Sequence, residues 1–376
     1  MDESPRFSVL ATAPPPGADA RKDSSDSSAP QDGRTVEFLF ENYPVTLVNA
    51  LRRTILGRID YVAAARAAHN STAPFVVQSN TGRLDDDMLI DRLSMVPIHL
   101  SPAEVDGYIP GSMRVRLRVR NETRKPADVT SADLEVELHD TPVASAHMFP
   151  PCPLSGDHVL ITKLFPGEEV AMYWDLRKDT QSTHAAFQVA TVAMRFVVDE
   201  AAADEAVAKI SGDADLAPDV RRRDLNYART IGRQRLFAAA PSGDPAGIIL
   251  RVEPLAGFTA RATLDAAVRF VYNKFLVDSI RVETEPTETR GEHVYRILGE
   301  DATFGSVLQH LAMDRADEIG LVAVGYSETH PLKKEILVRA RFADAAEDAM
   351  AGFTRMKNAV GRDVERLMDL IKIPSV

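Results

Sequence analysis

Hydrophobic and polar residues recur along the chain with two periods, that of a strand and that of a helix. Apolar residues three or four positions apart lie on one face of a helix, and strict alternation marks a strand with one buried face. The helical spacing is found at 47–55, 258–277, 304–311 and 343–372. Alternation is clearest at 114–120 and 133–138, where arginines fill the polar positions of the first segment and acids those of the second. Pairing of these two strands would set cations against carboxylates, each pair contributing a few tenths of a kcal/mol.

The order of these elements repeats near the two ends of the chain. Residues 46–51 and 303–308 both follow a strand and open an amphipathic helix, and an alternating strand with a second such helix comes later in each copy, at 248–277 and 335–372. Two copies with exposed apolar stripes can bury those stripes against each other, so the repeat predicts an intramolecular pseudo-dimer. The residues expected in its core are the apolar positions of these helices: Leu47, Leu264, Val268, Val271, Phe275, Phe304, Leu308, Phe353, Val360, Val364 and Leu367.

These patterns predict an α+β protein with two dimerisation domains, each a sheet with helices, and an inserted, mostly β domain. Residues 11–34 are rich in proline and serine and are expected to be disordered, and 283–292 is polar and is expected to be a linker. The insertion 199–246 interrupts the first dimerisation domain. The expected boundaries are 1–34 for an amino-terminal strand and the disordered segment, 35–60 with 184–282 for the first domain, 61–183 for the inserted domain, 283–292 for the linker and 293–376 for the second domain.

The amino-acid composition argues against several classes of protein. The 376 residues include 44 Lys and Arg against 55 Asp and Glu, a net charge of −11, which argues against a free-standing nucleic-acid binder. The one cysteine, Cys152, excludes an internal disulfide and a thiolate-rich metal site, and it fits a reducing compartment. No run approaches the roughly 18 apolar residues of a membrane helix, and the amino end begins acidic where a signal peptide begins basic.

Although the chain is acidic overall, residues 221–235 are rich in arginine. This stretch is the best candidate for contact with nucleic acid or with an acidic neighbouring subunit. Because Tyr227 is its one aromatic residue, a solvated loop or a subunit contact is favoured over nucleic acid. Its arginines are Arg221, Arg222, Arg223, Arg229, Arg233 and Arg235.

Two groups of residues raise the question of catalysis. Asp85, Asp86 and Asp87 suit either the metal site of a transferase or the start of a helix at 87–93, and the helix is favoured because no second cluster accompanies them. The irregularly spaced His147, Cys152 and His158 are more typical of a loop than of a metal site. Phosphate-binding loops and zinc motifs are absent. We therefore predict no catalytic residue, no metal and no cofactor.

Specific motifs resemble one family. The run Asn49-Ala50-Leu51-Arg52-Arg53 resembles a helix of the α subunit of bacterial RNA polymerase and of the third-largest subunit of RNA polymerase II. Residues 91–98 resemble a second element of those subunits, with Ser94 in place of the usual glycine. Residues 300–308 and 324–332 resemble the small partner subunit, the eleventh of RNA polymerase II. The chain thus resembles a fusion of the two α-like subunits, an arrangement associated with large double-stranded DNA viruses.

The resemblance implies a non-catalytic assembly platform in transcription. Such a subunit binds the two large catalytic subunits of a DNA-directed RNA polymerase, and small accessory subunits bind beside it. It is not expected to form a homodimer or to bind a membrane, and its contact with DNA is indirect at most. It implies an intracellular location, in the nucleus, viral factory or virion of an infected cell, with the cytoplasm as a further alternative. The residues implied at the subunit interface are Asn49, Leu51, Arg52, Arg53 and Arg92.

Two departures from the family and two competing functions accompany this expectation. The metal-binding or cluster-binding cysteines of some cellular relatives are absent, and nothing after Val376 corresponds to the DNA-binding carboxyl-terminal domain of bacterial α. The competing functions are a metal-dependent transferase that uses Asp85 and Asp87, and a stand-alone structural protein.

Overall fold

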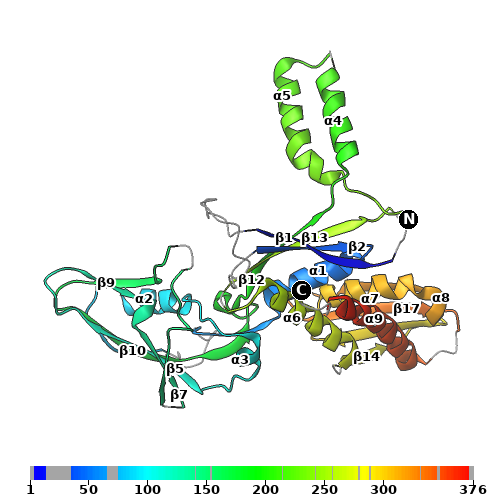
Figure 1. Ribbon diagram of the computed structural model, residues 1–376. Coiled ribbons are helices and arrows are strands. Elements are labelled where there is room, and N and C mark those ends of the chain that lie inside the picture. Colours follow the sequence, from blue (N-terminus) through cyan, green and yellow to red (C-terminus); the bar gives the residue numbers. More distant parts are fainter. Residues whose placement is uncertain are drawn as a thin grey trace.

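A computed structural model describes most of the chain and divides it into three parts (Figure 1). A body of two sheets and their helices contains both ends of the described chain, a β-rich lobe extends to one side, and a helical hairpin stands away from the body. All strand pairs are antiparallel, and the mixture of such sheets with helices is the predicted α+β class. The described residues are 4–13, 35–65, 75–139, 141–152, 155–213, 215–241, 243–255, 257–277, 280–287, 289–330, 332–344 and 348–371.

The first unit of the body is a four-stranded sheet covered on one face by helices α1 and α6. Its strands lie in the order β1-β2-β13-β12. The strands are β1 (Arg6–Ala13), β2 (Thr35–Glu41), β12 (Ala190–Phe196) and β13 (Gly247–Pro254). The helices are α1 (Val45–Gly57) and α6 (Ala260–Tyr272), the latter continued by a π-helical turn, η5 (Asn273–Val277).

The second unit repeats this arrangement. Its sheet has the order β14-β15-β17-β16. Counted along the chain, the second strand of each unit therefore pairs with the fourth strand, and the fourth strand pairs with the third. The strands are β14 (Arg281–Glu285), β15 (Glu292–Leu298), β16 (Leu321–Glu328) and β17 (Glu335–Phe342). The helices are α7 (Ala302–Asp314), α8 (Ala316–Ile319) and α9 (Ala349–Ile371).

The helices of the two units pack on one another. Helix α1 contacts α6 and α7, and α9 contacts α6 and α7. The rings of Phe275, from η5, and Phe304, from α7, stack with their centroids 4.7 Å apart and their planes 8° from parallel. All eleven residues expected in the core between the two copies are buried. The apolar stripes of the four helices therefore lie inside the body, where they are removed from water.

The lobe is built on a five-stranded sheet in the order β4-β10-β5-β7-β8, with β6-β9 and β3-β11 as separate pairs. Its strands are β3 (Asp60–Ala63), β4 (Phe75–Asn80), β5 (Met113–Arg120), β6 (Ala127–Thr130), β7 (Leu134–Leu138), β8 (Thr141–Val143), β9 (Leu160–Leu164), β10 (Glu169–Asp175) and β11 (Arg177–Thr180). Its helices are α2 (Asp86–Ser94) and α3 (Pro102–Asp106), with 3₁₀ turns at Ser131–Asp133 and Ala185–Phe187.

The predicted pairing of the arginine-bearing strand with the acidic strand is confirmed. Strand β5 pairs with β7, and Arg116 lies opposite Glu135 in the register. The closest contact is diagonal, with Nη2 of Arg116 3.1 Å from Oε2 of Glu137. Arg114 instead reaches β10, where its Nε donates to Oδ1 of Asp175 at 2.8 Å. The row of cations is thus matched by acids on both neighbouring strands.

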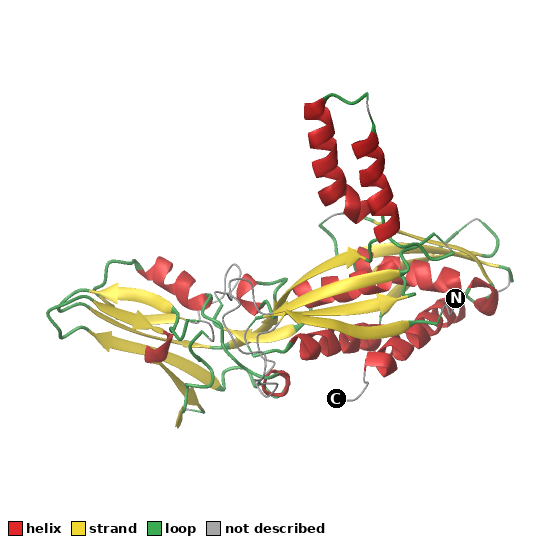
Figure 2. Ribbon diagram, turned by 45° about the horizontal axis from the view of Figure 1, so that its top comes forward, coloured by secondary structure: helices red, strands yellow, loops and turns green. Residues whose placement is uncertain are grey.

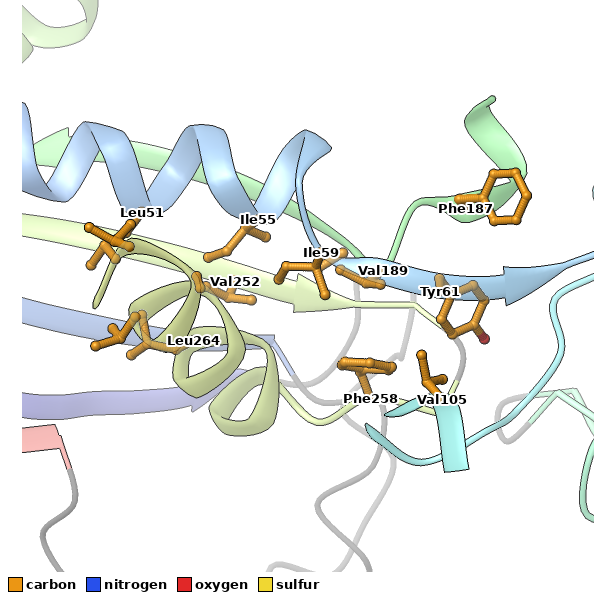
Figure 3. Packing of buried hydrophobic residues seen from close by; sticks show 14 of the residues in the cluster. Leu51, Ile55, Ile59, Tyr61, Val105, Phe187, Val189, Val252, Phe258 and Leu264 are labelled. Carbon is orange, nitrogen blue, oxygen red and sulfur yellow. The ribbon is translucent and has the colours of Figure 1, made fainter. Parts of the chain in front are cut away.

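Packed side chains join the lobe to the body (Figure 3). The buried cluster runs from Leu51 and Leu264, between α1 and α6, past Ile59 to Tyr61 and Phe258. The rings of Tyr61 and Phe258 meet edge to face with their centroids 5.8 Å apart, and the Tyr61 hydroxyl donates to the carbonyl of Ile98. Contact between the lobe and the body is therefore apolar as well as covalent.

The helical hairpin lies between β12 and β13 and stands clear of the sheets in both views (Figures 1 and 2). It consists of α4 (Glu200–Gly212) and α5 (Pro218–Tyr227), followed by a π-helical turn, η3 (Ala228–Gly232), and a 3₁₀ turn, η4 (Arg233–Arg235). The Asp199 carboxylate caps α4 by accepting from the backbone N–H of Ala202 at 3.0 Å. The arginine-rich stretch, for which a solvated loop was one expectation, is therefore helical.

Two sequence-based expectations need correction. The segment 283–292 is not a free linker, because β14 ends at Glu285, β15 begins at Glu292 and the two strands pair as a hairpin. Residues 11–13 were expected to be disordered and instead form the end of β1, while 14–34 lie outside the described residues. In the part of the chain that the structure describes, no helix has the length and apolar character needed to cross a membrane.

Candidate subunit-interface surface

Helix α1 separates a buried side from an outer side that carries Asn49, Arg52 and Arg53. Pro44 precedes the helix with a φ of −58°, the value that a helix start requires. Asn49 and Arg52 are half-buried and Arg53 is exposed; their spacing of three and four residues places them on one face. Leu51 belongs to the other side and is 0% exposed. Its assignment to the subunit interface is therefore wrong, since the side chain is fully used in the chain's own core.

Asn49 holds the side chain of Arg52. The Nε of Arg52 donates to Oδ1 of Asn49 at 2.9 Å, one helical turn away. The terminal nitrogens of Arg52 have no hydrogen-bond partner within the described residues. A guanidinium held by its Nε still presents its outer fork, the geometry that binds a carboxylate through two parallel hydrogen bonds.

Arg53 and Arg58, near the end of α1, meet the first residue before α7. Oδ2 of Asp301 lies 2.7 Å from Nη2 of Arg58 and 3.8 Å from Nη2 of Arg53. Asp301 also caps α7, because its Oδ1 accepts from the N–H of Thr303 at 2.9 Å. Burial raises the pKa of Asp301, but the hydrogen bonds from Thr303 and the charge of Arg58 outweigh it, so the pKa lies below its ordinary value. This ion cluster ties the first unit to the second.

The neighbouring acid, Glu300, is buried beside Lys274. The Nζ of Lys274 lies 2.8 Å from Oε1 of Glu300, which is 6% exposed. Burial raises the pKa of Glu300, and the contact with Lys274 offsets part of that rise. Burial of this carboxylate is tolerated because the ammonium group that faces it supplies both a charge and a hydrogen bond.

These residues line a cleft of about 490 Å³ between α1, α6 and the start of α7. Its floor is apolar and includes Val271, Phe275 and Phe304. The charged residues that line it are Arg52, Arg53, Arg58, Lys274 and Lys334, against Glu300 and Asp301. Five cations against two acids give the cleft a positive character, which favours an acidic or carboxylate-bearing segment.

Arg92 lies apart from this surface. It is on α2, in the lobe, and its Nη2 donates to the carbonyl of Leu160 at 3.1 Å (Figure 1). The structure therefore does not bring Arg92 together with Asn49, Arg52 and Arg53. Ser94, which stands where the family has glycine, is the last residue of α2 and lies within its helical backbone. The substitution consequently needs none of glycine's conformational freedom.

Two of the three aspartates at 85–87 form hydrogen bonds at the start of α2. Oδ1 of Asp85 accepts from the N–H of Met88 at 2.8 Å and caps α2, and Oδ1 of Asp86 accepts from Nδ2 of Asn80 at 2.7 Å. Nδ1 of His158 lies 3.4 Å from Oγ of Ser131. Across the described ranges, no three His, Cys, Asp or Glu side chains group in a way that would hold a metal ion. The geometry thus favours the helix-start interpretation of 85–87.

Sequence reasoning missed Arg58 and its contact with Asp301. Asp301 is identifiable as a helix cap from its position before an amphipathic run. Its partner is 243 residues away along the chain, so no local pattern connects the two. The sequence signal that could have found this contact is the similarity of the two units. Packing of two similar units brings the end of α1 beside the start of α7, its counterpart.

Comparisons with known proteins agree with the motifs over part of the chain, although no family model matches it. The chain is 26% identical over 190 residues to the DNA-directed RNA polymerases I and III subunit RPAC1 of Homo sapiens, covering 45% of this chain and 53% of that protein. The same subunit of Bos taurus matches with the same identity and coverage. A conjugation stage-specific protein of Tetrahymena thermophila is 31% identical over 109 residues, covering 26% of this chain and 33% of that protein.

The fold and the comparisons define a class: an α+β chain with a region homologous to an α-like subunit of RNA polymerase. The chain spans about half the length of the curated RPAC1 relatives that it matches. The particular similarity is to the RPAC1 subunit of human, bovine and mouse polymerases I and III, at 26% identity over 188 to 190 residues.

Proposed function

We propose that this chain is a non-catalytic assembly-platform subunit of a multisubunit DNA-directed RNA polymerase. The observation that carries the proposal is the similarity to RPAC1, a subunit of DNA-directed RNA polymerases by its printed name. Of the motif that suggested the same class, Asn49, Arg52 and Arg53 lie on the outer face of α1, beside an open cleft, where a partner can reach them. The proposed site of action is wherever that polymerase works, the nucleus or a viral factory.

The proposal includes the fusion of two α-like units in one chain. Both units have the same strand order, and each covers one face of its sheet with two long helices. The stack of Phe275 on Phe304 and the ion cluster around Asp301 both join the first unit to the second. Helix faces buried within one chain are not available to a second copy, so the fused chain is expected to be a monomer when alone. Covalent connection also replaces an encounter between two subunits by an intramolecular one.

The proposed contact with a large catalytic subunit is centred on Arg52. Asn49 orients its guanidinium and leaves the outer nitrogens without a partner in the described residues. A carboxylate of the partner would then be bound through two hydrogen bonds, while the positive cleft accepts neighbouring acidic residues. Arg53 contributes differently, because it already faces Asp301 within the chain.

The test is purification of the tagged full-length chain from its native source, comparing wild type with Arg52→Glu. Charge reversal at Arg52 should abolish co-purification of the two large polymerase subunits, because a carboxylate then meets the acidic partner. The circular dichroism and melting temperature of the free variant should be unchanged, because among the described residues the hydrogen bond of Arg52 is to Asn49 on the same helix.

Arg118→Glu is the matched control. Arg118 is exposed on β5, in the lobe, where it lies opposite Ala171 of β10, and its reversal changes the net charge by the same amount. This control should retain the large subunits. Normal co-purification of Arg52→Glu would contradict the assignment of this surface. Arg53 is left unchanged in the test, because a glutamate there would repel Asp301 and confuse binding with stability.

A further inference from the structure

The helical hairpin projects from the body, and its two ends are close together. At its base the backbone N–H of Asp199 donates to the carbonyl of Leu236 at 2.9 Å, and Arg233 pairs with Glu200. Toward its tip, Nη2 of Arg221 donates to the carbonyl of Leu216 at 3.2 Å. No residue of α5 is buried, so one whole side of this helix faces solvent.

The six arginines of the hairpin fall into two groups that the sequence does not separate. Arg221, Arg223 and Arg233 have partners inside the chain; for Arg223 the partner is Asp224, whose Oδ1 lies 3.0 Å from Nε. The other three are exposed and have no hydrogen bond or ion pair within the described part of the chain. These unpaired arginines are Arg222, Arg229 and Arg235.

Arg222 and Arg229 lie on one face of the hairpin. Seven residues separate them, which corresponds to two helical turns and a rise of about 10 Å. Asn226 lies between them, and all three line one shallow depression of about 800 Å³. The charged residues of that depression are four arginines and Asp219, which is in the first turn of α5. A chain of net charge −11 therefore carries a concentrated positive face on its most projecting element.

The composition of this face suits phosphate better than protein. Protein interfaces are centred on buried aromatic or aliphatic anchors, and here the apolar lining residues are Pro218 and a half-buried Leu225. Contact with a phosphate backbone needs positive charge and hydrogen-bond donors without an apolar centre. No aromatic ring lines the depression, so unpaired bases would find nothing to stack on.

We propose that the face of Arg222, Asn226 and Arg229 binds the phosphate backbone of double-stranded nucleic acid without reading its sequence. This contact is direct, whereas the sequence-based expectation was indirect contact at most. It does not depend on the proposed assembly role, because it uses an element that lies away from α1.

Fluorescence anisotropy of a labelled 25-base-pair DNA duplex with the full-length chain tests this at about 50 mM salt. Wild type should bind, and Arg222→Gln with Arg229→Gln should weaken binding at least tenfold. Each phosphate contact contributes about 0.9 to the slope of log K against log salt, so the double variant should lower that slope by about 1.8.

The matched control is Arg195→Gln with Arg233→Gln, which removes the same net charge from arginines that have internal partners and lie outside the depression. It should keep affinity within threefold of wild type, with unchanged helix content by circular dichroism. Three results would overturn the proposal. They are no duplex binding by wild type, equal loss in both double variants, and tighter binding of single-stranded DNA or of polyglutamate through the same arginines. The polyglutamate result would indicate an acidic protein partner.

Discussion

The two units of the body have the same strand order but very different connections. In the second unit, α7 reaches β16 through the short α8, and six residues separate β16 from β17 along the chain. In the first unit, the corresponding connections contain the lobe, between α1 and β12, and the hairpin, between β12 and β13. The lobe begins directly after α1 and leads to β12, whereas the hairpin joins two neighbouring strands, and neither addition interrupts one of the packed helices. The comparison indicates that the helix faces are constrained and that the connections are open to change.

The largest expected effect comes from the stacked rings between the units. Phe275→Ala removes an aromatic ring from a fully packed site and should lower the free energy of unfolding by about 3–5 kcal/mol. Phe237→Ala, at the half-buried base of the hairpin, should cost less than half as much. Urea unfolding of both variants measures this. Similar small losses would indicate that the two units are not held by their helix faces.

Substitution of Gly361 in α9 by alanine should have the next largest effect on the free energy of unfolding. It should destabilise the protein, although Gly→Ala usually stabilises a helix. Gly→Ala inside a helix normally stabilises by up to about 1 kcal/mol. At Gly361 a Cβ would lie 2.3 Å from Cδ2 of Leu276, which is on the turn that follows α6. Gly361→Ala should therefore cost about 1–3 kcal/mol of unfolding free energy.

Gly212 is the matched control for this experiment. It ends α4, and a Cβ there meets nothing within 4 Å. Gly212→Ala should be neutral or slightly stabilising in the same urea titration. If Gly361→Ala proves stabilising too, the close approach of α9 to the first unit is wrong.

The ion cluster at Asp301 should have a smaller, pH-dependent effect. Asparagine also caps helices, so Asp301→Asn removes the charge and keeps the cap, at a cost of a few tenths to about 1 kcal/mol. The folded-state pKa of Asp301 is lowered, so its charge adds stability above the ordinary value of 3.8. That advantage of wild type over the Asp301→Asn variant should vanish as pH falls through the lowered pKa. Thermal unfolding of both proteins between pH 7 and pH 3 measures it; a difference that grows toward low pH would contradict the sign.

Removal of the hairpin should have the smallest effect on the body. Asp199 and Leu236 are already joined by a backbone hydrogen bond, so two glycines can replace residues 200–235. The melting temperature of the remaining chain should change by no more than about 2 °C, and the duplex binding proposed above should be lost. Unfolding of the body on this deletion would show that the first unit depends on its insertion.

The spacing of hydrophobic residues and the pattern of charges predicted the helices and strands well wherever one face of the element is buried. The alternating rows at 114–120 and 133–138 specify both strand and partner, since arginines and acids alternate with apolar residues on each. The pattern fails for β14, because Glu283-Thr284-Glu285 on the edge of a sheet has the composition of a linker. Leu51 was misassigned because a motif names residue types and not the side of the helix on which each lies.

The candidate site was predictable only in part. Asn49, Arg52 and Arg53 follow from one short motif, and helical spacing places them together. The cleft beside them is made by residues far apart in sequence, such as Arg58, Lys274 and Asp301, and only the packing of the two units brings these together. Among the paired arginines of the hairpin, Arg233 depends on packing, because its partner Glu200 lies on α4, whereas the partners of Arg221 and Arg223 are close in sequence.

The measurement that tests the central proposal most directly is affinity purification of the intact chain from its native source, with identification by mass spectrometry of every chain that remains bound. The proposed function predicts the two large catalytic subunits of a DNA-directed RNA polymerase, in amounts equal to the tagged chain. A native particle that contains this chain and no polymerase subunit would contradict it.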